Sequence, residues 1–243
     1  MTLAYASGLT NEQWELLASQ LPAPKSTGRP RTVDLHQVVN AILYVLTSSC
    51  AWYLLANDFP PYSTVYYYFR QWRDDGTWKR VHDHLVQWVR VLEAHLSTPS
   101  AASLDSQSVP TAVMVHESVG YDAAKKTKGR KRFTLVDTFG LLLSVKVVAA
   151  SVPEREGATQ LLHKLEEERD RFPRLVRIWV DGGFDGKDFG QWIMDTFRLI
   201  WEVVLRPEGT KGFVLLPKRW MVENIQYQCR HKLQAEFYPY CWN

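Results

Sequence analysis

Apolar side chains in the first part of the chain recur at the spacing of helices. Val65, Phe69 and Trp72 follow one another at i, i+4 and i+7, and Thr10 with Gln13 forms the sequence signature of a capping box. Turns rich in proline and glycine separate the segments. The pattern predicts short helices near residues 10–21, 34–46, 52–56, 63–73 and 78–96.

The period changes after residue 97, where a segment rich in serine, alanine and proline predicts a linker. Apolar runs then predict strands at residues 102–109, 133–138, 141–149, 175–180 and 199–205. Helical patterns follow at residues 158–165, 187–198 and from about residue 217. This order predicts an α/β domain with a mixed sheet over residues 98–243, preceded by an all-α domain over residues 1–97.

The predicted helices of the first domain are short and joined by tight turns. This arrangement fits a helix-turn-helix unit, in which the second helix enters the major groove of DNA. Tyr66 and Arg70 lie on the helix that Ser63 opens, so they are the candidate DNA contacts of this domain. Any small helical bundle shows the same apolar stripes, so the pattern alone leaves both interpretations open.

Composition narrows the class of protein. Hydrophobic residues make up 46% of the 243 residues and charged residues 23%, which excludes global disorder. Three cysteines without a Cys-x-x-Cys pair favour a reducing compartment and argue against structural zinc. The N-terminus lacks the apolar core of a signal peptide, and Lys146 interrupts the longest apolar run. We therefore expect a soluble, cytoplasmic protein without a membrane partner.

The net charge of +3 is concentrated in one segment. Residues 101–150 hold 7 basic and 4 acidic side chains, whereas the parts on either side are balanced. Such a local field suits a polyanion such as DNA, although a short basic run is also common in solvated loops. The candidate contacts are Lys125, Lys126, Lys128, Arg130, Lys131 and Arg132.

Two aspartates interrupt or end apolar strands that helices are expected to cover. Asp105 lies within the first predicted strand, and Asp181 directly follows the strand at residues 175–180. An unpaired carboxylate there is costly, and a divalent metal ion would offset that cost. Glu223, near the last predicted helix, is positioned to complete an all-oxygen site for Mg²⁺. Backbone donors could satisfy the same carboxylates, so the residues alone leave both interpretations open.

Several longer motifs follow one another along residues 9–223. The first domain contains Gly28-Arg-Pro-Arg31 and Phe59-Pro-Pro-Tyr-Ser-Thr-Val-Tyr66. The second contains Leu104-Asp105-Ser-Gln-Ser-Val109, Gly120-Tyr-Asp-Ala-Ala-Lys-Lys-Thr-Lys-Gly-Arg-Lys-Arg132, Ala149-Ala-Ser-Val152, Asp181-Gly-Gly-Phe184 and Gly212-Phe-Val-Leu-Leu-Pro-Lys-Arg-Trp-Met-Val-Glu223. Together these motifs resemble the DDE transposases of bacterial insertion sequences, specifically the insertion-sequence-five group.

The resemblance implies an RNase H-like catalytic domain in which Asp105, Asp181 and Glu223 form the acidic triad and hold Mg²⁺ or Mn²⁺ ions. It implies that a homo-oligomer binds double-stranded DNA, both the element ends and the target, close to the nucleoid. Arg219 stands four residues before Glu223, as in the group's signature, and would contact phosphates. The implied activity is metal-dependent cleavage at terminal inverted repeats followed by strand transfer.

The sequence departs from the group's pattern directly after Glu223. Members of the group usually continue Arg-Thr-Phe and then carry a basic stretch, whereas this chain continues Asn224-Ile-Gln-Tyr227. The departure predicts a divergent or truncated tail. The tail favours one rival to an active transposase, a catalytically impaired remnant that only binds DNA. An unrelated nuclease is a third possibility.

Overall fold

A computed structural model describes residues 5–24, 30–111 and 118–204 of the chain. The chain divides into two compact units, and the division falls between Leu85 and Val86, within helix α4 (Thr77–Leu92). The division into domains at residue 97 stays a prediction, because α4 contributes residues to both units.

The first unit is all-α, and its elements lie close to the predicted positions. They are α1 (Asn11–Ala18), α2 (Leu35–Ser48), the 3-10 helix η1 (Trp52–Leu54), α3 (Tyr62–Asp74) and the first part of α4. The Thr10 side chain accepts a hydrogen bond from the Gln13 amide, and the Gln13 side chain accepts one from the Thr10 amide, so the capping box is confirmed. Helices α2 and α3 pack through Ile42, Val65 and Phe69.

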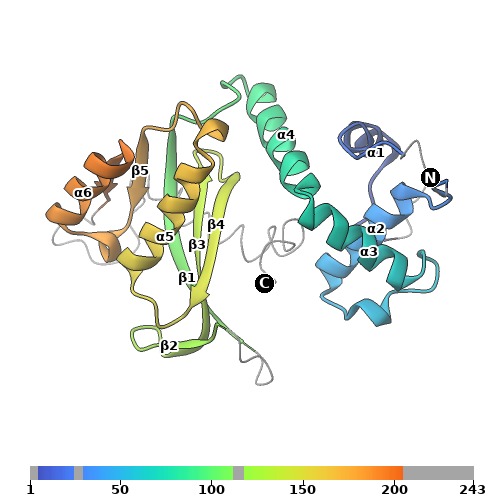
Figure 1. Cartoon of the computed structure of the whole chain (residues 1–243), viewed down its shortest axis with the longest axis horizontal. Helices are drawn as coiled ribbons and strands as arrows, with labels where there is room; N and C mark the ends of the chain where they lie inside the picture. The colour runs from blue at the N-terminus through green and yellow to red at the C-terminus, as the bar shows by residue number, and fades with distance from the viewer. Residues whose placement is uncertain (1–4, 25–29, 112–117, 205–243) are drawn as a thin grey trace. The chain divides into compact units, whose positions relative to one another are not determined.

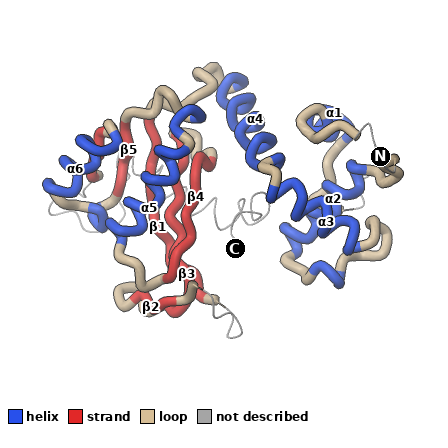
Figure 2. Tube along the Cα trace, viewed as in Figure 1, coloured by secondary structure: helices blue, strands red, loops and turns tan. Residues whose placement is uncertain are grey.

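The second unit is an α/β domain, shown in Figures 1 and 2. Its strands are β1 (Ala101–Pro110), β2 (Gly120–Asp122), β3 (Thr127–Asp137), β4 (Leu142–Ala149), β5 (Arg177–Val180) and β6 (Ile200–Val203). Its helices are α5 (Glu154–Glu167), η2 (Arg169–Arg171), η3 (Gly182–Phe184) and α6 (Lys187–Phe197).

The six strands form one mixed sheet with β1 at its centre. The order is β2-β3-β1-β5-β6, and β4 also pairs with β3. The pairs of β3 with β1 and β4 are antiparallel, whereas β1 with β5 and β5 with β6 are parallel. This arrangement is that of an RNase H-like core, as predicted.

Two features of the sheet differ from the sequence prediction. Strand β2 was not predicted, because three residues are too few to show a period. Strand β3 begins at Thr127, six residues before the predicted start, and therefore contains most of the basic segment. The backbone of that segment is fixed by pairing with β1 on one side and with β2 and β4 on the other. A basic sequence hides the alternation of a strand, since hydrophobicity no longer marks the buried face.

Helix α5 packs against the sheet through an unusually close contact at Gly157. A Cβ atom added to Gly157 would lie 2.1 Å from Cε2 of Phe133 on β3, whose ring is completely buried. Leu161, Leu162 and Leu165 continue the same buried face of α5. The small residue therefore sets how closely the first turn of α5 approaches β3.

Replacement of Gly157 by alanine is expected to destabilise the protein by about 1–3 kcal/mol, because overpacking against Phe133 outweighs the better helix propensity of alanine. Gly190 on α6 is the matched control, since a Cβ there would meet its nearest atom at 3.7 Å. Gly190→Ala is expected to stabilise by about 0.5–1 kcal/mol. Urea denaturation measures both, and equal effects of the two substitutions would contradict the packing constraint.

Candidate active site

Asp105 occupies the middle of the central strand. Asp105 pairs with Thr134 of β3 and is 5% exposed. Side chains alternate along a strand, so Asp105 lies on the face opposite Ala102 and Leu104, which pack in the core under α5 and α6. The predicted acid is therefore directed away from the helices that cover the other face.

Asp181 directly follows the neighbouring parallel strand. The register pairs Ser103 of β1 with Trp179 of β5, and each aspartate stands two residues further along its own strand. Neighbouring strands lie about 4.8 Å apart, so the register brings both residues to the same level at the carboxyl end of β5. An Asp181 Oδ1 atom accepts a hydrogen bond of 2.9 Å from the Gly183 amide, which turns the chain into η3.

The third predicted acid, Glu223, lies outside the described residues, as do Arg219 and the predicted last helix from about residue 217. Within residues 5–24, 30–111 and 118–204, no group of three or more His, Cys, Asp or Glu side chains could hold a metal ion. Asp105 and Asp181 supply carboxylate oxygens, which are the donors that Mg²⁺ and Mn²⁺ prefer. The two residues therefore fit part of a divalent-metal site.

Three predicted DNA contacts lie on the sheet face that carries Asp105. Arg132 pairs with Gln107 and Arg130 with Val109, both at odd-numbered positions of β1 like Asp105. Lys128 follows at the same alternation and pairs with Tyr121 of β2. A row of cations thus extends along this face from the level of Asp105 to the end of the sheet. Arg132 donates two hydrogen bonds to Gln107 Oε1, which hold its guanidinium over β1.

Lys131 lies on the other face and does not face the solvent. Only 4% of the residue is exposed, and its ammonium contacts Asp122 Oδ2 at 3.3 Å and Glu154 Oε1 at 3.3 Å. Lys125 precedes β3, is exposed, and also contacts Glu154, at 3.7 Å. Asp122 and Glu154 are not among the residues predicted from the sequence. The alternation of a strand would have separated Lys131 from Arg130 and Arg132, had β3 been assigned from Thr127.

Asp122 is an ionised, buried carboxylate. The hydrogen bond from Ser108 Oγ, at 2.6 Å, lowers the pKa of Asp122 most, and the Lys125 amide and Lys131 ammonium lower it further. Burial opposes these effects, and the resulting pKa is about 2, below the ordinary value of 3.8. The carboxylate therefore stays charged at any pH near neutrality.

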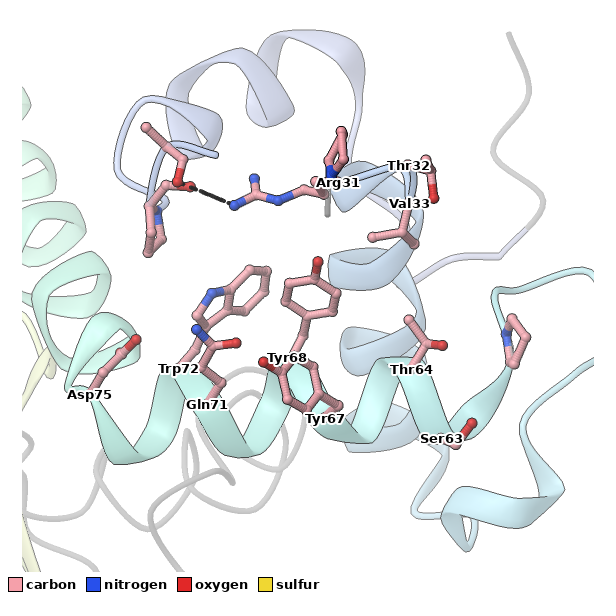
Figure 3. A pocket seen from close by; sticks show the side chains of 14 residues that line it. Arg31, Thr32, Val33, Ser63, Thr64, Tyr67, Tyr68, Gln71, Trp72 and Asp75 are labelled. Atoms are coloured by element: carbon pink, nitrogen blue, oxygen red, sulfur yellow. Dashed lines mark hydrogen bonds between the residues drawn. The ribbon is translucent and has the colours of Figure 1, made fainter. Parts of the chain in front are cut away.

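The predicted contacts of the first unit lie on the exposed side of α3. Tyr66 is 39% exposed, and the Arg70 guanidinium lies 5.9 Å from the centre of its ring. A neighbouring face of the helix lines an open cavity of about 1020 Å³ through Ser63, Tyr67 and Gln71. Figure 3 shows this cavity between α3 and the segment around Arg31. The exposed face of α3 thus presents aromatic rings, a cation and hydroxyl groups together.

Comparison with known proteins defines the class. The family model of the transposase DDE domain matches residues 96–236, and that of a transposase of the IS4/5 family matches residues 9–82. The chain belongs to the DDE transposase family. None of the curated proteins compared with the chain matches it. None of the helices within the described residues is long and apolar enough to cross a membrane.

Among solved structures, a piggyBac transposase synaptic complex with hairpin DNA, determined by cryo-EM, is similar at a TM-score of 0.37 and 11% sequence identity. The match covers 82% of this chain and 48% of the piggyBac chain. This chain therefore spans about half the length of that transposase.

The low pKa of Asp122 predicts how stability depends on pH. The carboxylate binds its proton more weakly in the folded state, so its contribution is present above pH 4 and is lost as pH falls from about 4 to about 2. At pH 7 Asp122→Asn is expected to lower the free energy of unfolding by about 2 kcal/mol, and at pH 2.5 by much less. Urea denaturation across this range measures the difference.

Asp195→Asn, at an exposed position of α6, serves as the control and is expected to change stability little at either pH. A constant difference between wild type and Asp122→Asn from pH 7 to pH 2.5 would contradict the assignment of an ionised, stabilising carboxylate.

Proposed function

We propose that this chain is a DNA transposase of an insertion sequence, which cleaves DNA at the ends of the element and joins them to a target. Membership of the DDE transposase family supports the class of reaction. The observation that carries the proposal is the parallel register of β1 and β5, which brings Asp105 and Asp181 to one level at the end of β5. The cations of β3 lie on the same face as Asp105.

Asp105 and Asp181, with Glu223 as the third ligand, would hold the divalent metal ions that DDE transposase domains use. We infer Mg²⁺, with Mn²⁺ as a substitute, because all three ligands are carboxylates. When bound, such ions activate a water molecule or a 3′-hydroxyl and stabilise the leaving oxygen. The contribution of the chain is to fix the acids: pairing with Thr134 of β3 holds Asp105 in β1, and the Gly183 amide orients Asp181.

The DNA backbone would lie along the face of β3 that carries Lys128, Arg130 and Arg132. Phosphate contacts of this kind supply affinity without sequence preference. Tyr66 and Arg70 on α3 would contact the element ends, as expected for the second helix of a helix-turn-helix unit. Assembly of a homo-oligomer on the paired ends, and association with the nucleoid, follow from the same proposal.

The acids are tested by removing one charge at a time. Asp105→Asn and Asp181→Asn are each expected to reduce Mg²⁺- or Mn²⁺-dependent nicking of a supercoiled plasmid by at least about 100-fold, because a displaced catalytic group costs this much in rate. DNA affinity, measured by fluorescence anisotropy on a linear duplex, is expected to stay within a factor of about three, since no phosphate contact is removed.

Asp195→Asn is the control for a lost carboxylate, and its nicking rate is expected to equal that of wild type. Retained nicking in both Asp105→Asn and Asp181→Asn would overturn the assignment. A wild-type chain that binds DNA and nicks it with neither metal would instead support the DNA-binding remnant.

The DNA contacts are tested by their salt dependence. Lys128→Ala with Arg130→Ala is expected to weaken binding to every sequence and to reduce the slope of log affinity against log salt by about 1 for each lost phosphate contact. Tyr66→Ala is expected to reduce the preference for the element ends and to leave that slope nearly unchanged.

Lys146→Ala on β4 removes the same charge elsewhere in the sheet, and it controls for net charge. An unchanged salt slope in the Lys128 and Arg130 variant would show that this face of β3 does not contact DNA.

A further inference from the structure

A chain of charged side chains connects the second half of β1 with the end of β5, on the side of the sheet that α5 covers. Its centre is Lys131, whose ammonium contacts Asp122 and Glu154, each at 3.3 Å, and donates a hydrogen bond of 3.0 Å to the Val152 carbonyl. Replacing a buried ion pair by apolar residues is often neutral for stability. The significance of this chain of charges therefore lies in what it positions.

Asp122 fixes the turn that leads into β3. One of its carboxylate oxygens accepts hydrogen bonds of 3.1 Å from the Ala124 and Lys125 amides, and the other binds Ser108 and Lys131. The turn directs the Lys125 side chain back over β1. There its ammonium lies 3.2 Å from the carbonyl oxygen of Ser106, the residue after Asp105.

Glu154 lies close to the residues that follow β5. It is the first residue of α5, and a Cβ atom added to Gly183 would lie 3.9 Å from Glu154 Cγ and 3.1 Å from Asp181 Oδ1. Lys125, beside Ser106 of β1, and Glu154, beside the turn that follows β5, therefore contact each other close to the residues that carry the two acids. The close packing of Gly157 on Phe133 holds the first turn of α5 at this position.

The two lysines differ in how readily their ammonium groups can leave their carboxylate partners. The Lys131 side chain is 5% exposed and is held by two carboxylates, whereas the Lys125 side chain is 42% exposed and contacts Glu154 at the longer distance of 3.7 Å. If Lys125 turned to an incoming anion, Lys131 would still neutralise Glu154. The Lys125 ammonium is thus the accessible end of an otherwise closed chain of charges.

We propose that Lys125 binds the phosphate group at which the DNA strand is cut, and that Asp122, Lys131 and Glu154 are positioning residues for it. An ammonium is a compact point charge suited to a non-bridging phosphate oxygen. This inference deepens the proposed function and rests on it. It also separates Lys125, on the α5 side of the sheet, from Lys128, Arg130 and Arg132, which lie on the face of Asp105 and contact the DNA further along β3, and it gives Lys131 a structural role.

The first test separates cleavage from binding. Lys125→Ala is expected to reduce the nicking rate of a supercoiled plasmid at saturating protein by about 100-fold with Mn²⁺, as the loss of one charge-stabilising donor does. The dissociation constant for the same DNA is expected to change less than about threefold, and Lys125→Arg is expected to recover part of the rate. Lys146→Ala is the control for charge and is expected to cleave like wild type.

The second test addresses positioning. Glu154→Gln is expected to slow nicking, and adding it to Lys125→Ala is expected to cause little further loss, because residues that act as a unit are not additive. Glu167→Gln, at an exposed position near the other end of α5, is the control. Additive losses in the double variant would overturn the positioning role. A raised dissociation constant with an unchanged saturated rate in Lys125→Ala would make this lysine a flanking contact.

The third test does not require the chain to cleave DNA. The probe is a small phosphodiester, thymidine 5′-(4-nitrophenyl phosphate), with Ca²⁺, and lysine acetylation is followed by mass spectrometry. The probe is expected to protect Lys125 at least threefold and to leave the exposed Lys126 and Lys128 unprotected. If the probe leaves the acetylation rate of Lys125 unchanged, as it does those of Lys126 and Lys128, the inference is overturned. Protection of Lys125 in a chain that nicks no plasmid would contradict the proposed function alone.

Discussion

The parallel pairing of β1 with β5 is the constraint on which the candidate site depends. Ser103 opposite Trp179 fixes the register, and every residue beyond follows at the same level on both strands. β5 ends at Val180, so Asp181 stands at the point where the chain leaves the sheet and its side chain can turn toward the Gly183 amide. A register shift by one residue would move Asp181 along the sheet and reverse the face toward which it points.

The same sheet assigns different tasks to the cations of a single segment. Alternation along β3 places Arg130 and Arg132 with Asp105 on one face and Lys131 with Ser108 on the other. On the first face the guanidinium groups can meet a polyanion, and on the second the ammonium closes a chain of buried carboxylates. A basic run therefore serves both as a binding surface and as internal structure. Its net charge alone could not distinguish the two.

The sequence predicted what local patterns determine and missed what pairing determines. The capping box at Thr10 was correctly predicted, since neighbouring residues decide it. So was the β3–β4 hairpin that turns at Gly140, where φ is positive. The RNase H-like core was expected from the family resemblance. Strand β2 was missed because three residues are too few to show a period. The roles of Asp122 and Glu154 were missed because they depend on tertiary contacts, such as that of Lys131 with Glu154.

Two buried ion pairs of the second unit show how such groups differ in consequence. Arg90 binds Asp137, whose other oxygen accepts hydrogen bonds from the Phe139 and Leu141 amides, while the Arg90 Nε donates to the Leu96 carbonyl. These bonds are all made to other groups of the protein, so the pair fixes the end of α4 and the β3–β4 turn. The charged side chains around Lys131 also bind other groups of the protein at Asp122. Their series ends, however, at Lys125, whose side chain is partly exposed at the level of the two acids. Burial supplies a rigid support in both cases, and only the second has an accessible charge for that support to position.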